Sequence, residues 1–148
     1  INLADLYRMT GREQDGKKVI TTALNLAPDN AELNMSYALW LVREKEIEQA
    51  IPLLRKAAQS SSNPHICYVY AIALAQTGSI SEALKELDKA AALPTYNRDV
   101  QLTRIDFALQ QKNLPRAKLA LTQWKRLDPQ DPAITEWEKI LASIPASR

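Results

Sequence analysis

Along this chain, segments of helical length carry apolar residues three or four positions apart, with polar residues between them. This spacing is typical of amphipathic α-helices, and clusters of Pro, Gly, Asn and Asp mark the turns between them. The chain lacks the strict alternation that marks β-strands, so we expect an all-α fold. The pattern predicts nine helices, at about residues 2–10, 13–26, 31–44, 47–59, 65–77, 80–92, 98–111, 115–127 and 132–143.

The first eight predicted helices form four pairs that repeat one pattern. A small residue recurs near the start of each second helix at intervals of 34, 33 and 34 residues: Gly16, Ala50, Ala83 and Ala117. An aliphatic residue follows four positions later in each copy: Ile20, Leu54, Leu87 and Leu121. Small side chains let two helices approach closely, and the larger apolar ones fill the space beside them. The repeats run at about residues 1–30, 31–63, 64–97 and 98–131.

The end of the fourth pair differs from the other three. The next column of the repeat carries Ala23, Ala57, Ala90 and then Trp124. The helix predicted at 132–143 follows Asp131, a suitable N-cap, and begins with Pro132. Its apolar stripe is Ile134, Trp137, Ile140, Leu141 and Ile144. We therefore expect a capping helix that covers the open end of the fourth pair, with Trp137 buried near Trp124.

The turns inside the pairs share one column. Gly11 and Gly78 occupy it in two copies, where a left-handed backbone is often needed, and Lys45 and Lys112 occupy it in the other two. Glycine adopts positive φ at little cost, whereas lysine does not. The two lysine turns should be less favourable than the two glycine turns.

A helix–turn–helix repeat of about 34 residues with small residues at the helix crossings resembles the tetratricopeptide repeat family, and the resemblance covers the whole chain. It implies a right-handed α-solenoid of four helix pairs plus a C-terminal capping helix, in one domain over residues 1–148. In such a fold no repeat buries its apolar face alone, and stacking makes one continuous core.

The family resemblance also implies where a partner would bind. First helices line the concave face in this family, and fixed positions on them contact a protein or peptide. The matching positions here are Met9, Glu32, Met35, Leu39, Val42, Arg43, Tyr68, Ile72, Gln76, Leu102 and Asp106. An apolar patch would occupy the middle of that groove: Met35, Leu39, Val42, Tyr68 and Ile72. A helix between two neighbours buries more than one stripe, so the sequence leaves open whether this patch is groove or core.

Composition and charge narrow the class of partner. The net charge is +2, and Lys and Arg are interspersed with Asp and Glu, so no basic stripe indicates nucleic acid. No segment reaches the roughly 18 consecutive apolar residues that a membrane-spanning helix needs. We expect a protein or peptide partner, without nucleic acid and without membrane insertion.

Motifs of catalysis or cofactor binding are lacking. The chain has no haem-attachment motif, no zinc-protease motif and no phosphate-binding glycine loop. His65, the only histidine, lies beside Pro64 at a helix start and is expected at the surface. Cys67, two residues on, could be a thiol activated by that imidazole, but its repeat position favours a buried small apolar residue. We expect a non-catalytic protein with no cofactor or metal.

The first residues suggest a longer parent. Ile1 falls inside the repeat motif, so we expect a fragment of a longer polypeptide. The uncovered first pair would then favour a homodimer through Leu3, Leu6 and Tyr7.

The phrasing of residues 2–8, 37–43 and 68–74 also resembles bacterial tetratricopeptide regions that follow multihaem cytochrome domains. This resemblance implies a periplasmic or envelope location, with the haems outside these residues; a cytoplasmic location stays open. Two functions are compatible with the sequence. One is a protein-interaction module with a ligand in the groove, and the other is a structural module that packs against its parent's upstream domain or a second copy.

Overall fold

The computed structural model describes Tyr7 and residues 9–145. The described part is all-α, with helices α2 (Glu13–Leu26), α3 (Ala31–Arg43), α4 (Ile47–Gln59), α5 (Pro64–Gln76), α6 (Ile80–Ala91), α7 (Arg98–Gln110), α8 (Leu114–Leu127) and α9 (Pro132–Ser143). These helices match the predicted ones to within one residue at each end. In the predicted helix at 2–10, Tyr7 and Met9 are helical, and residues 2–6 and 8 lie outside the described residues. The proposed dimer contacts of Leu3 and Leu6 fall in that part.

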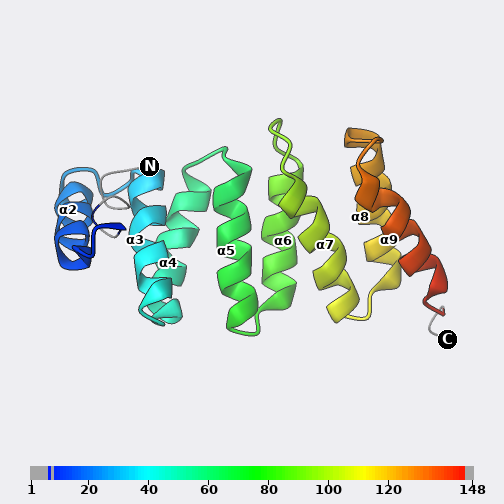
Figure 1. Cartoon of the computed structure of the whole chain (residues 1–148), viewed down its shortest axis with the longest axis horizontal. Helices are drawn as coiled ribbons and strands as arrows, with labels where there is room; N and C mark the ends of the chain where they lie inside the picture. The colour runs from blue at the N-terminus through cyan, green and yellow to red at the C-terminus, as the bar shows by residue number, and fades with distance from the viewer. Residues whose placement is uncertain (1–6, 8, 146–148) are drawn as a thin grey trace.

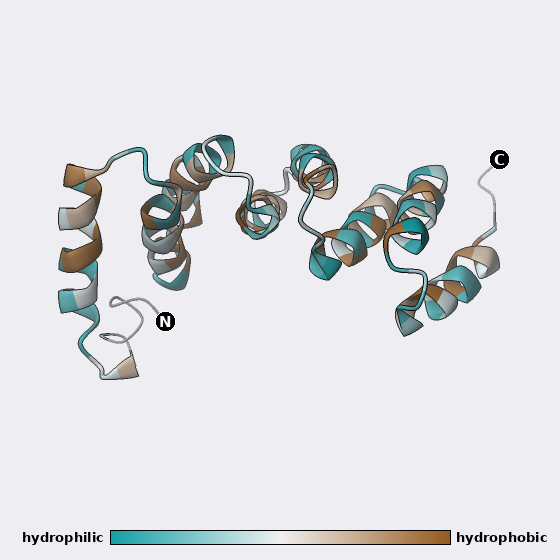
Figure 2. Cartoon of the chain, turned by 90° about the horizontal axis from the view of Figure 1, so that it is seen from above, coloured by the Kyte–Doolittle hydropathy of each residue, from teal (hydrophilic) through white to brown (hydrophobic). Residues whose placement is uncertain are grey.

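The helices stack side by side in chain order and form an elongated array, with α2 and α9 at opposite ends (Figure 1). α3 packs on α4, α5 on α6 and α7 on α8, and each pair packs on the next. Seen from above, the helices between α3 and α8 alternate between two layers (Figure 2). The first helices α3, α5 and α7 make one layer, and the second helices α4, α6 and α8 make the other. This arrangement is the predicted α-solenoid of helix pairs.

The core follows the repeat columns. The small residues Ala38, Ala50, Ala71, Ala83 and Ala117 are fully buried at the helix crossings. One cluster of buried side chains runs from α3 to α6 and includes Val100 and Phe107 of α7. A second cluster joins α7, α8 and α9, and includes Ile105 and Ala108. α7 contributes to both clusters, so it connects the two parts of the core.

Helices α3, α5, α7 and α9 each begin at a side-chain N-cap in one column of the repeat. The caps are Asn30, Asn63, Asn97 and Asp131, and each accepts a hydrogen bond of 3.0–3.1 Å from a backbone N–H in the first turn. An N-cap of this kind satisfies a donor that the helix leaves unpaired. The expected cap at Asp131 is confirmed. The sequence therefore sets the start of every first helix from α3 onward.

The turns inside the pairs have the expected left-handed backbone. Gly11, Lys45, Gly78 and Lys112 have φ values of 71°, 65°, 83° and 55°. The repeat thus imposes one conformation on this column whatever residue occupies it. Lysine there is strained, since its Cβ lies too close to the backbone in the left-handed region.

Gly78→Ala should lower stability by about 1–2 kcal/mol, the cost of a left-handed non-glycine residue. A Cβ at Gly78 would meet no atom within 4 Å, so the loss is conformational and not steric. Lys45→Gly is the matched control, and it should leave stability equal or slightly higher. Urea unfolding of the two variants measures both effects; equal losses in both would contradict the account of this column.

The C-terminal end of the fourth pair is covered by α9, as predicted. Trp124 is fully buried, and its indole N–H donates a 2.9 Å hydrogen bond to the Tyr96 hydroxyl. Trp137 packs against the same cluster, as expected, but it is only half-buried and so less covered than expected. α9 is amphipathic and turns one side to solvent in the described part; Ile140 on that side is 38% exposed.

An ion pair fastens the start of α9 to the start of α7. The Arg98 guanidinium donates to both carboxylate oxygens of Asp131, at 2.6 and 3.1 Å, and also lies over the Trp124 ring. These hydrogen bonds from Arg98 hold the pKa of the Asp131 carboxyl below its ordinary value. Asp131 therefore serves both as N-cap and as ion-pair partner.

This pair predicts an acid-sensitive cap. A carboxyl whose pKa is lowered by folding stabilises the fold above its ordinary pKa, and this contribution disappears as the pH falls through the folded-state pKa. Asp131→Asn keeps an N-cap but loses the charge. Wild type should therefore melt higher than Asp131→Asn at neutral pH, and the gap should close on acidification. A gap that stays constant across the acid range would contradict this role.

Candidate partner-binding surface

The predicted binding residues lie mainly on the layer of first helices. α3 carries Glu32, Met35, Leu39, Val42 and Arg43; α5 carries Tyr68, Ile72 and Gln76; α7 carries Leu102 and Asp106. Within each helix successive positions are three or four residues apart, except for the adjacent pair Val42 and Arg43, so they lie along one side of each helix. Met9 precedes α2 and is 65% exposed. The repeat thus brings the predicted residues of three successive first helices to one side of the array.

The apolar residues of this face are half-buried. Met35, Val42, Tyr68 and Ile72 pack against the core cluster of α3 to α7, and Leu102 packs against the C-terminal cluster. Leu39 is also half-buried but belongs to neither cluster. The patch of Met35, Leu39, Val42, Tyr68 and Ile72, called the first-helix patch below, is therefore partly core and partly surface.

Exposed polar residues surround the first-helix patch. Glu32, Arg43, Gln76 and Asp106 are all exposed. Within the described residues, none of the three charged groups takes part in an ion pair. Asp106 accepts a 2.9 Å hydrogen bond from the Gln110 amide on its own helix. A rim of this kind can set the register of a ligand more than its affinity.

The two residues weighed for catalysis differ in exposure. Cys67 is 4% exposed, and burial raises the pKa of its thiol, which makes it a poor nucleophile. His65 is exposed, as predicted, and its ring stacks on Tyr68 at a centroid distance of 6.1 Å. In the described range, no three residues with metal-binding side chains gather into a possible site. Nor is any described helix both long and apolar enough to cross a membrane.

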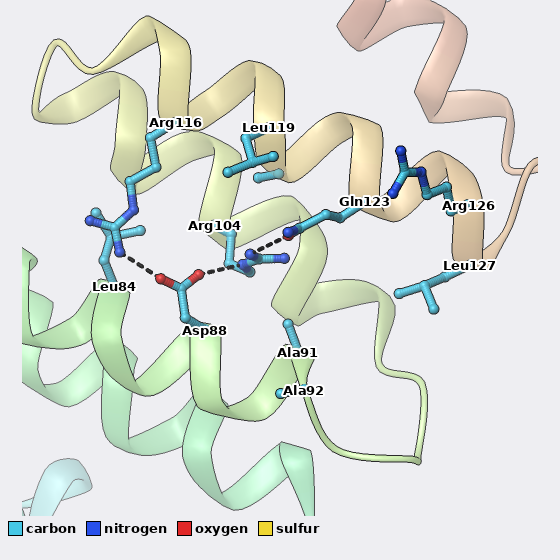
Figure 3. A pocket seen from close by; sticks show the side chains of 11 residues that line it. Leu84, Asp88, Ala91, Ala92, Arg104, Arg116, Leu119, Gln123, Arg126 and Leu127 are labelled. Carbon is cyan, nitrogen blue, oxygen red and sulfur yellow. Dashed lines mark hydrogen bonds and ion pairs between the residues drawn. The ribbon is translucent and has the colours of Figure 1, made fainter.

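The second helices carry a feature that sequence reasoning missed. At the junction of the second and third pairs, Arg55 donates to the Tyr70 hydroxyl at 3.0 Å and lies 3.8 Å from Glu82. At the next junction, the equivalent positions hold Asp88, Arg104 and Arg116. There Arg104 and Arg116 donate to Asp88 at 2.8 and 2.6 Å (Figure 3).

The two junctions thus use the same three repeat positions; the charge is reversed at two of them, and a tyrosine is replaced by an arginine at the third. Arg55 and Asp88 are in one column, Tyr70 and Arg104 in the second, and Glu82 and Arg116 in the third. A comparison of the polar residues at equivalent positions of the repeats could have revealed these two sets from the sequence. Each junction has its own electrostatic partner set, which favours this order of repeats over a permuted one.

Comparison with known proteins identifies the repeat. Two family models, both described as tetratricopeptide repeat, match residues 41–93 and residues 1–64 with 68–132. A mouse protein, interferon-induced protein with tetratricopeptide repeats 3, is 28% identical over 122 residues. That match covers 82% of this chain and 30% of the mouse protein, so the chain spans less than a third of that relative.

Solved structures show the same fold. The crystal structure of MamA superposes with a TM-score of 0.76 at 16% identity, covering 95% of this chain and 83% of that chain. A tetratricopeptide repeat protein from Parabacteroides merdae gives 0.77 at 13%, covering 93% and 56%. YrrB, described as a TPR protein with an unusual peptide-binding site, gives 0.70 at 18%, covering 92% and 71%. With family models matched along most of its length, this chain belongs to the tetratricopeptide repeat family.

Proposed function

We propose that this chain is a non-catalytic interaction module that binds a segment of a protein partner across its first helices. The observation that carries the proposal is the first-helix patch, whose apolar side chains keep part of their surface exposed between charged residues without ion pairs. Tetratricopeptide repeat proteins typically bind proteins or peptides, and YrrB is described with a peptide-binding site.

The chemistry of the patch indicates the kind of ligand. Met35 and Tyr68 offer a flexible and an aromatic surface, and Leu39 contributes an aliphatic one. An amphipathic helix or an extended segment with apolar anchors fits such a face. Arg43 and Glu32 would contact polar residues that flank the anchors.

A second candidate function is structural packing against another domain or a second copy of the chain. It is supported by exposed apolar side chains at the N-terminal end of the array, where Leu26 is 84% and Met9 is 65% exposed. Surfaces of this kind are often contact sites. The resemblance to regions beside multihaem domains would make the upstream domain the partner, and it stays a prediction, as does the periplasmic or envelope location.

Matched leucine substitutions separate the two functions. Leu39→Lys should abolish partner capture and lower the melting temperature less than Ile72→Lys does, because Leu39 is half-buried but belongs to neither core cluster. Leu26→Lys makes the same chemical change at an exposed site and should leave capture intact. Ile72→Lys, which buries a charge against the core, should lower the melting temperature more strongly. Capture lost with Leu26→Lys and kept with Leu39→Lys would overturn the proposal in favour of structural packing.

A further inference from the structure

A pocket lies among the second helices, between α6 and α8 (Figure 3). It has a volume of about 500 Å³, within the range of ligand sites in proteins. α6 supplies one wall through Leu84, Asp88 and Ala91, α8 supplies the other, and Arg104 reaches in from α7. The first-helix patch belongs to the other layer, so this pocket is separate from the proposed groove.

The pocket has an excess of positive charge. Its lining holds three arginines, Arg104, Arg116 and Arg126, and one carboxylate, Asp88, which leaves two positive charges uncompensated. Arg104 is 8% exposed and spends its donors on Asp88, Gln101 and Gln123, at 2.8, 3.1 and 2.7 Å. The Arg104 guanidinium is therefore satisfied, and the excess lies on the other two arginines.

Arg116 and Arg126 are the two arginines of the pocket whose guanidinium groups have hydrogen-bond donors left for a ligand. Arg116 makes one side-chain hydrogen bond, from Nη2 to Asp88, and its side chain is 33% exposed. Arg126 is exposed and forms no ion pair within the described residues. A guanidinium presents a fork of donors that matches a carboxylate, so these two side chains favour a carboxylate ligand.

The remaining surface of the pocket is apolar. Leu119 and Leu127, eight residues apart on α8, are each 57% exposed. Leu84 and Ala120, which also line the pocket, are buried. Two exposed leucines beside Arg126, which has no ion pair within the described residues, form a surface that is complementary to an acidic residue with apolar neighbours, and a small free anion would leave both leucines uncovered.

We propose that the α6–α8 pocket is a second docking site, which takes an acidic, partly apolar segment of a partner protein. An Asp or Glu of that segment bonds Arg126, and apolar side chains on either side of it cover Leu119 and Leu127. The module then has two binding faces, one on each layer of helices, and can hold two segments at once.

The probe for this site is a set of fluorescein-labelled peptides in which Glu and Leu are placed at every spacing within one helical turn. Each has a counterpart with Gln in place of Glu. Binding is measured by fluorescence anisotropy with the full chain. At least one Glu peptide should bind. The Kd of its Gln counterpart should be higher by roughly tenfold or more, as expected for loss of a charge-assisted hydrogen bond.

Two charge reversals on α8 locate the site. Arg126→Glu should weaken binding of the Glu peptide roughly tenfold or more. Lys118→Glu makes the same charge change at an exposed residue outside the pocket and should leave binding unchanged. Leu39→Lys should also leave it unchanged, which separates this proposal from the first-helix groove.

Several results would overturn the proposal. They are a failure of every Glu peptide to bind, equal binding of Glu and Gln peptides, and equal losses with Arg126→Glu and Lys118→Glu. Displacement of the peptide by free acetate or inorganic phosphate at equal concentration would show a site for small anions and would also reject it.

Discussion

Trp124→Ala is expected to destabilise the C-terminal end of the array by about 3–5 kcal/mol, the range for truncation of a buried tryptophan. Trp124 is fully buried between α7, α8 and α9, and its indole N–H is bonded to Tyr96. Alanine occupies this column in the other three repeats, yet here it would leave a cavity. The substitution that makes the repeat more regular should therefore be among the most damaging.

Hydrogen exchange locates the loss. In a one-dimensional array each repeat contacts only its neighbours, so protection should fall first in α8 and α9 and least in α3 and α4. Trp137→Ala is the control and should cost less, since Trp137 is half-buried. Uniform loss along the chain, or a larger effect from Trp137→Ala, would contradict this account of the C-terminal end.

Asp88→Ala should cost roughly 1.5–3 kcal/mol, the range for hydrogen bonds to charged groups. Arg104 is nearly buried, and without Asp88 its guanidinium keeps only two glutamine side chains as partners. A buried charge that loses its counter-charge is costly, because desolvation is no longer offset. Urea unfolding measures the loss.

The preceding junction supplies the control for Asp88. A triple variant, Asp88→Arg with Arg104→Tyr and Arg116→Glu, copies the set Arg55, Tyr70 and Glu82 into the next junction. It should recover most of the stability that Asp88→Ala loses, because the same columns again form a satisfied set. If the triple variant is no more stable than Asp88→Ala, the equivalence of the two junctions is wrong.

The helices were predictable because each turn carries its own local signal. Asn30, Asn63 and Asn97 cap successive first helices, and Gly11 and Gly78 provide left-handed turns. These signals depend on the backbone of a few consecutive residues. They therefore hold whatever the rest of the chain does, and the boundaries follow from the sequence to within a residue.

Burial was harder to predict than position. Family positions placed the predicted binding residues on the first helices, but they could not say how much of Leu39 or Ile72 the neighbouring helices would cover. The same holds for Trp137, whose exposure depends on how α9 leans on α8. The exposure of a side chain depends on its own helix and on the helices packed on either side of it. A repeat alignment gives only its position on its own helix.

The α6–α8 pocket was not predicted from the sequence, for a different reason. Arg104 stands where Tyr37 and Tyr70 stand in earlier repeats, so it resembles a degraded position of an apolar pattern. The role of Arg104 depends on its ion pair with Asp88, which is 16 residues away on another helix. Comparison of polar columns between repeats would have paired the two residues, since Arg55 and Tyr70 have the same spacing to within one residue.

The central claim, that a partner lies on the first-helix patch, is tested most directly by photo-crosslinking from position 39 in the protein's native cells. A photoreactive amino acid replaces Leu39, and the control replaces Leu26 in the same way. The account predicts that position 39 crosslinks to one segment of another protein, with apolar residues at the adduct, and that position 26 does not crosslink to that segment. Adducts at position 39 that contain only residues of this chain, or the same partner segment from both positions, would contradict it.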